Sequence, residues 1–138
     1  MALVNEILEL LMFMLFMHVI GDWLLQNNAL ANMKQKLFWK KAIDDMQLDY
    51  EDYKYDYIAA LINHSVCWSV CILIPAVVLK GFTWGLFIIF IVNTIVHAYI
   101  DNQKANEFSI NLVKDQIYHL VFQILPTLLV LAFMYNWR

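Results

Sequence analysis

Four long apolar segments alternate with more polar ones along the chain. They cover about residues 7–26, 58–79, 82–101 and 115–135. A helix needs roughly 20 apolar residues to cross the hydrocarbon core of a bilayer, and in lipid each backbone polar group must be paired within its own segment. We therefore predict that residues 1–138 form a single all-α domain, an integral membrane four-helix bundle.

The one sizeable polar segment, residues 27–57, joins the first predicted helix to the second. Its first part, Leu30–Lys41, has apolar residues at helical spacing with lysines between them, which is typical of a helix on the membrane surface. Its second part, Asp44–Tyr57, is acidic and rich in tyrosine. We interpret residues 27–57 as a solvated interfacial or cytoplasmic loop. A loop that binds a protein partner or collects metal ions is the alternative.

The composition supports a membrane protein and excludes several other classes. The chain is 62% hydrophobic and 15% charged, far more apolar than an ordinary soluble domain. A net charge of -3 gives no basic field for nucleic acid, so we expect the lipid bilayer and not nucleic acid as a partner. The sequence contains no glycine-rich phosphate loop, serine nucleophile elbow or CxxC pair, which excludes the enzyme classes that depend on them.

The distribution of basic residues predicts the orientation in the membrane. Seven lysines lie in or beside the segments that join helix one to two and helix three to four, whereas Lys80 and Arg138 lie on the opposite side. Cytoplasmic flanks of membrane helices are enriched in lysine and arginine. We therefore predict a multi-pass protein of the cell inner membrane with both termini outside.

Polar residues recur at four-residue steps within the apolar segments, and residues four apart share one face of a helix. Histidine precedes aspartate in the first and third helices, and aspartate precedes histidine in the fourth. Since alternate helices run in opposite directions, this reversal places all the acids and imidazoles at one depth, near the cytoplasmic ends. The three sets are His18, Asp22 and Gln26; Asn93, His97 and Asp101; and Asp115, His119 and Gln123, while His64 begins the second helix.

Neutral imidazole and carboxylate are usual ligands of zinc, iron and related divalent ions. Four histidines and three aspartates exceed one tetrahedral shell, so we predict two ions, or one ion with a carboxylate and a histidine left for proton transfer. Zinc is the first expectation, and manganese and iron are alternatives. The alternative to a metal site is a set of separate ion pairs and interfacial residues. The predicted ligands are His18, Asp22, His64, His97, Asp101, Asp115 and His119, and the residues expected to orient them are Gln26, Ser65, Asn93, Gln116 and Gln123.

These motifs resemble a family of small bacterial and phage membrane proteins, domain of unknown function 3307. The resemblance spans most of the chain and keeps the motifs in order. It implies a polytopic membrane protein but no particular activity. The matching residues are His18–Gln26, Lys34, His64–Ser65, His97–Asp101 with Lys104, and Asp115–His119.

Three functions fit the sequence. The first is a metal-dependent hydrolase at the cytoplasmic membrane face, with Asp22 or Asp101 as the base. The second is an ion or proton transporter or relay, because acids and histidines mark such pathways in membranes. The third is a non-enzymatic adaptor whose polar cluster is structural and whose loop 27–57 recruits a partner. We also expect a homo-oligomer, because Gly21 and Gly85 allow close approach of helices.

Overall fold

The computed structural model describes residues 2–135, and all regular secondary structure in that range is helical, which confirms the all-α prediction. Four helical segments are long and apolar enough to cross a membrane. Insertion of the four as a membrane bundle stays a prediction. The segments are α1 (Ala2–Val19) with the π-helical turn η1 (Ile20–Leu24); α5 (Asp56–Lys80); α6 (Trp84–Ala105); and α7 (Leu112–His119), the π-helical turn η2 (Leu120–Ile124) and α8 (Leu125–Met134).

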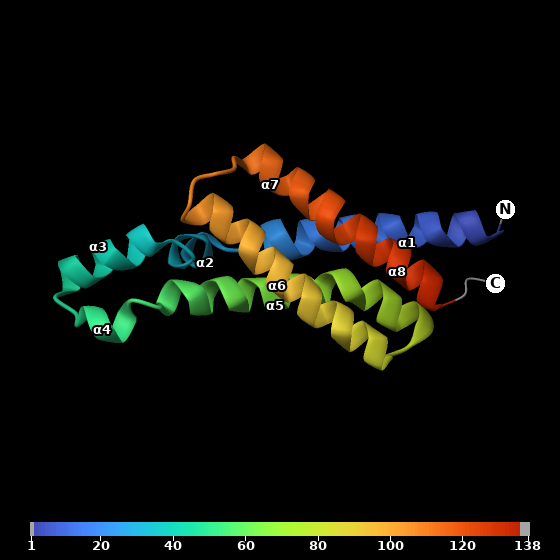
Figure 1. Cartoon of the computed structure of the whole chain (residues 1–138), viewed down its shortest axis with the longest axis horizontal. Helices are drawn as coiled ribbons and strands as arrows, with labels where there is room; N and C mark the ends of the chain where they lie inside the picture. Colours follow the sequence, from blue (N-terminus) through green and yellow to red (C-terminus); the bar gives the residue numbers. More distant parts are fainter. Residues whose placement is uncertain (1, 136–138) are drawn as a thin grey trace.

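The long segments alternate in direction, with α1 and α5 along the long axis and α6 and the α7–α8 segment at an angle to them (Figure 1). The helices α1 and α5 pack against each other, and α6 packs against α5 and crosses the molecule obliquely (Figure 1). The start of α1 and the end of α8 lie at one end of the molecule, and the connection from α6 to α7 lies toward the other (Figure 1). Alternate segments therefore run in opposite directions, which is the arrangement that the reversed motif order requires.

Side-chain caps explain why the last two predicted boundaries, 82–101 and 115–135, differ from the observed ones. The side chains of Thr83 and Asn111 each accept a hydrogen bond from the backbone N–H three residues on, at 3.2 and 2.9 Å. Such caps fix where a helix begins. The helix α6 also continues to Ala105, four residues beyond the predicted end, and this extra turn carries Lys104.

The hydrophobic core lies between α1, α5, α6, η2 and α8, with Trp68 completely buried within it. Gly21 allows η1 to approach α5 closely: a Cβ atom at Gly21 would lie 3.3 Å from both the Trp68 Cα and the Cys71 Cβ. This close approach is made within one chain. Gly21 therefore does not supply a face for self-association, and the homo-oligomer stays a prediction.

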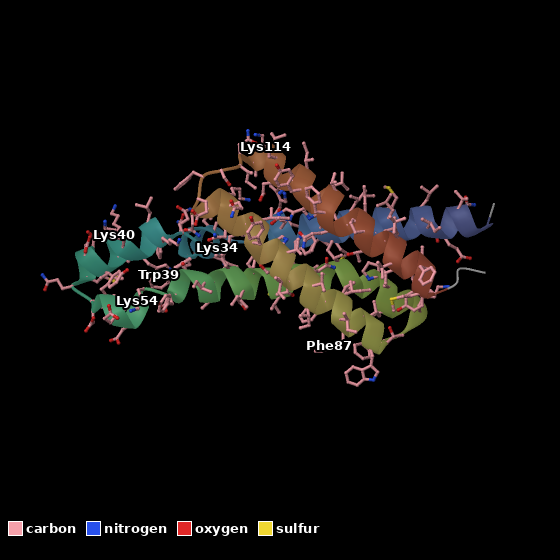
Figure 2. The ribbon with its side chains drawn as sticks, in the orientation of Figure 1. Lys34, Trp39, Lys40, Lys54, Phe87 and Lys114 are labelled. Atoms are coloured by element: carbon pink, nitrogen blue, oxygen red, sulfur yellow. The ribbon has the colours of Figure 1, made fainter. Side chains whose placement is uncertain are left out.

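The predicted helix over Leu30–Lys41 is not continuous, because the chain breaks there into α2 (Asn28–Met33) and α3 (Lys36–Met46). Its place on the membrane surface stays a prediction. Gln35 is extended, and Lys34 turns inward at the end of α2. The helices α3 and α4 (Tyr50–Tyr53) form a hairpin that projects beyond α5 (Figure 1). The hairpin is closed by stacking of Trp39 on Tyr53, with ring centroids 6.3 Å apart. Figure 2 shows Lys34 where this hairpin joins the long helices.

Candidate metal centre

Six of the seven predicted ligands come together in two groups that share Asp22. Within each group, one possible ligand atom per residue lies within 4.8 Å of all the others. Asp22 is 6% exposed and the other five side chains are completely buried. The structure therefore contains a buried histidine and aspartate cluster able to hold a metal ion. The groups are Asp22, His64, His97 and Asp101, and Asp22, Asp115 and His119.

Five buried atoms of this cluster have no hydrogen-bond partner: His64 Nδ1, His97 Nε2, His119 Nε2, Asp101 Oδ1 and Asp115 Oδ1. His119 Nε2 lies 3.4 Å from Asp101 Oδ1 and 3.5 Å from Asp115 Oδ1. His97 Nε2 lies 3.9 Å from the same Asp101 oxygen. Two ligand atoms of a tetrahedral zinc ion lie about 3.3 Å apart, given bonds of about 2.0 Å. Because unpartnered buried polar atoms are costly, a shared cation fits this arrangement.

Gln123 fixes the protonation of two of the imidazoles. Its Nε2 donates to the Asn93 carbonyl oxygen at 2.9 Å, so its Oε1 is the atom that faces the histidines. That oxygen can only accept, and it lies 2.7 Å from His119 Nδ1 and 3.3 Å from His97 Nδ1. Both rings therefore carry a hydrogen on Nδ1. In the neutral form each Nε2 keeps a lone pair for a metal ion. Outer-shell residues such as Gln123 usually set the tautomer of ligand histidines in this way.

Replacing Gln123 with leucine is expected to weaken divalent metal binding about 10–100-fold, because both imidazoles lose the acceptor that orients them. Competition with a fluorescent zinc chelator in detergent micelles measures the change. The control is Gln103→Leu, because the Gln103 amide oxygen bonds only the exposed Ser109 hydroxyl among the contacts described. Equal zinc affinity of the two variants would contradict this role of Gln123.

Two lysines that were not predicted as site residues, Lys34 and Lys104, pair with carboxylates of the cluster. The Lys34 side chain is buried, pairs with Asp101 Oδ2 and donates to Gln26 Oε1 at 2.5 Å. Lys104 Nζ lies 2.5 Å from Asp115 Oδ2 and 4.0 Å from Asp101 Oδ1. The available signals were the three-residue step from Asp101 to Lys104 and the presence of both lysines in the motifs of the resemblance.

His18 belongs to neither group of possible ligands. The Trp68 indole donates to His18 Nδ1 at 2.9 Å, so His18 Nε2 is left to donate to Gln116 Oε1 at 3.0 Å. Gln116 in turn donates from Nε2 to Asp22 Oδ2 at 2.7 Å. Both ring nitrogens of His18 are therefore occupied within the protein. His18 is therefore linked to Asp22 through Gln116, a connection suited to positioning Asp22.

The other residues expected to orient the ligands differ in what they touch. The Ser65 hydroxyl donates to a backbone carbonyl of its own helix at 2.7 Å and bonds no member of the cluster, so its predicted role is not seen in the described contacts. The Asn93 amide bonds Thr127 at 3.0 Å, and its backbone carbonyl holds Gln123. Gln26 contacts the site through Lys34.

Each of the two π-helical turns contains a side chain of the site. Asp22 lies in η1. Gln123 lies in η2, the turn that begins directly after His119. A π turn is locally wider than an α-helix and frequently occurs at functional sites. It also changes the face of the helix on which later residues lie. The four-residue spacing therefore predicted that these side chains are near the site but not which way each of them points.

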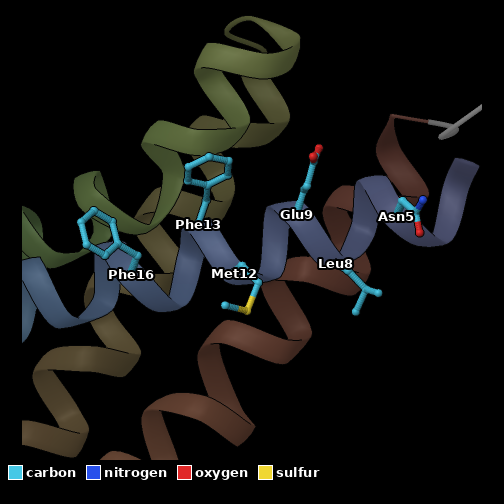
Figure 3. A pocket seen from close by; sticks show the side chains of 6 residues that line it. All are labelled: Asn5, Leu8, Glu9, Met12, Phe13 and Phe16. Atoms are coloured by element: carbon cyan, nitrogen blue, oxygen red, sulfur yellow. The ribbon is translucent and has the colours of Figure 1, made fainter.

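A separate shallow hollow follows the outer face of α1, on the N-terminal side of Asp22 (Figure 3). Its lining is apolar apart from an asparagine and a glutamate. None of its residues belongs to the histidine and aspartate cluster. The lining residues are Asn5, Leu8, Glu9, Met12, Phe13 and Phe16.

No family model, curated protein or solved structure matches this chain. The resemblance to domain of unknown function 3307 therefore stays a prediction. The support for a function comes from the buried histidine and aspartate cluster itself.

Proposed function

We propose that this is a polytopic membrane protein that binds a divalent metal ion in the histidine and aspartate cluster and uses it for hydrolysis at one face of the membrane. The supporting observation is the pair of buried ligand groups that share Asp22, in which five side-chain atoms have no hydrogen-bond partner. Imidazole and carboxylate donors fit zinc best, with manganese and iron as alternatives. Two ions would occupy the site if both groups are filled.

A bound ion of this kind activates a water molecule and polarises a carbonyl or phosphoryl oxygen. The protein supplies an oriented carboxylate beside it. Asp22 Oδ2 accepts from Gln116 at 2.7 Å, and Asp22 Oδ1 lies 3.2 Å from His64 Nε2. Asp101 is the alternative base, because its Oδ1 has no hydrogen-bond partner while its Oδ2 is held by Lys34. We assign the role of base to Asp22 or Asp101. The imidazoles and the remaining carboxylates would bind the ion.

The cluster lies toward the end of the long helices where the α2–α4 segment and the α6–α7 connection are found (Figure 1). If the four helices cross a bilayer, the site is close to one membrane face. The excess of lysine at that end supports the cytoplasmic face of the inner membrane. We therefore propose that both termini are outside.

Transport across a single chain has less support. The polar connections lead from Gln123 to Asn93 and from Asn93 to Thr127. One turn further along α8 lies Leu131, which belongs to the buried apolar core together with Leu86. The described residues thus provide a polar route into the site from one end but no continuation through the other half.

The test compares hydrolysis of 4-nitrophenyl esters and phosphates by metal-loaded protein, chelator-treated protein and the Asp22→Asn variant in micelles. We expect metal-dependent release of nitrophenol, reduced about 10²–10⁴-fold in Asp22→Asn. The matched control is Asp44→Asn, an exposed acid on α3. Protein that carries stoichiometric metal but hydrolyses no member of the panel contradicts the hydrolase and favours the adaptor with a structural metal.

A further inference from the structure

An apolar groove runs between η1 and α7 on the outside of the helical bundle. Its walls are apolar except for one amide, Gln116. The wall residues are largely exposed, with Val113 at 65% and Ile117 at 49%. In a bilayer such an apolar groove would contact acyl chains, and its lining suits an alkyl chain. The lining residues are Trp23, Leu112, Val113, Gln116, Ile117 and Leu120.

Gln116 connects this groove to the candidate metal centre. Its Nε2 lies 2.7 Å from Asp22 Oδ2 and 3.2 Å from Asp115 Oδ2. The Lys104 ammonium lies 2.5 Å from that same Asp115 oxygen. The Lys104 side chain is 25% exposed, whereas the Asp101 and Asp115 side chains are completely buried. A partly exposed cationic group therefore lies at the edge of the site, linked through Asp115 to the amide that lines the groove.

The charge of the site indicates which ligand it favours. Three carboxylates, Asp22, Asp101 and Asp115, face two ammonium groups, Lys34 and Lys104, which leaves one negative charge when the histidines are neutral. Histidines that bind a metal are neutral, so one divalent ion changes this balance to one positive charge. A buried charge without a counter-charge is costly. The metal-loaded site therefore favours an anion.

We propose, on the basis of the function proposed above, that the substrate is an amphiphile with a phosphate head group. Its alkyl chain lies in the groove, and its phosphate oxygens accept from Lys104 and face the metal centre. Phosphate is the anionic group of membrane lipids, and its oxygens form strong charge-assisted hydrogen bonds with ammonium. In the hydrolysis, the oxygen of water forms a bond to phosphorus, the bond from phosphorus to the lipid oxygen breaks, and a proton from the water goes to the lipid alcohol.

The experiment measures lipid binding to metal-loaded protein by native mass spectrometry, after the metal content of the same sample is determined. The probes are a short-chain phosphatidic acid made as its non-hydrolysable phosphonate, so that it is not turned over (called the phosphatidic acid below), the diacylglycerol with the same chains, and inorganic phosphate as competitor. We expect the phosphatidic acid to bind at least about tenfold more tightly than the diacylglycerol. Inorganic phosphate at equal concentration should not displace it, because phosphate alone gains nothing from the groove.

Two variants test separately how the phosphate head group and the alkyl chain of the lipid contribute to binding. Lys104→Met removes the accessible ammonium, and Ile117→Trp fills the groove from a half-exposed position. Each is expected to weaken binding of the phosphatidic acid about tenfold or more. The matched controls are Lys114→Met, an exposed lysine on α7, and Ile95→Trp at a 64% exposed position of α6. Both controls should bind like the unchanged protein.

A sample without bound metal contradicts the proposed function itself. A metal-loaded sample that binds both lipids equally, or whose binding is unaffected by Ile117→Trp, overturns the substrate class alone. Displacement of the lipid by equal inorganic phosphate also overturns it. If Lys104→Met fails to fold, Ile117→Trp still tests the substrate class. Ile117 takes part in none of the described ion pairs, so its replacement leaves the charges of the site unchanged.

Discussion

The Lys34→Met variant is expected to be less stable than the unchanged protein by about 3–5 kcal/mol in the presence of a chelator, because it leaves the buried Asp101 carboxylate without its ammonium. The Asp101 and Lys34 side chains are 0% and 3% exposed, so water cannot replace the lost partner. Unfolding in mixed micelles of mild detergent and sodium dodecyl sulfate, followed by far-ultraviolet circular dichroism, measures the free energy.

Lys36→Met is the matched control two residues away. Lys36 lies 3.5 Å from Glu107, and both side chains are about half exposed. Loss of such an exposed pair costs less than about 1 kcal/mol. In the Lys34→Met background, Asp101→Asn should restore part of the stability by removing the uncompensated charge. Equal stability of the Lys34→Met and Lys36→Met variants would show that Lys34 is not the counter-ion of the site.

Trp68→Ala is the second change with a large expected effect, a loss of about 3–5 kcal/mol in the free energy of unfolding. Trp68 is completely buried and stacks on His97 with ring centroids 4.3 Å apart. Trp68→Phe keeps most of the volume but removes the indole N–H from His18 Nδ1. Leaving that nitrogen unpaired is expected to cost about 1–3 kcal/mol.

The control for Trp68 is Trp84→Ala, because Trp84 is 78% exposed at the start of α6. Its loss should change the free energy of unfolding by less than about 0.5 kcal/mol in micelles. Trp68→Phe should also weaken metal binding, since His18, Gln116 and Asp22 are linked by successive hydrogen bonds. A Trp68→Phe variant with unchanged stability and unchanged zinc affinity would contradict the positioning role of His18.

The sequence predicted the helical segments and most of the cluster because both depend on simple periodicities. Apolar runs of spanning length give helices, and the reversed order of histidine and aspartate in α7 is what antiparallel neighbours need. These two facts placed Asp22, His97, Asp101, Asp115 and His119 together, and the structure agrees. The helix boundaries were less accurate, because caps at Thr83 and Asn111 act outside the hydrophobic pattern.

The contacts of individual side chains could not be predicted in the same way. Lys34 lies in a polar segment, where an inward and an outward lysine have the same sequence pattern, and only the break between α2 and α3 turns it toward Asp101. The π turns change the direction of Asp22 and Gln123, and although Gly21 and Pro126 lie at these turns, neither residue specifies a π turn. His18 was expected to bind metal, but the distant Trp68 occupies its Nδ1. These features depend on tertiary packing.

The metal content of detergent-purified protein, measured by inductively coupled plasma mass spectrometry, tests the central claim most directly. We expect about one or two zinc, manganese or iron ions per chain. We also expect loss of metal from the His97→Ala and His119→Ala variants and retention by Asp44→Asn. Metal-free protein whose His97→Ala and His119→Ala variants match it in stability would contradict a metal site in this cluster.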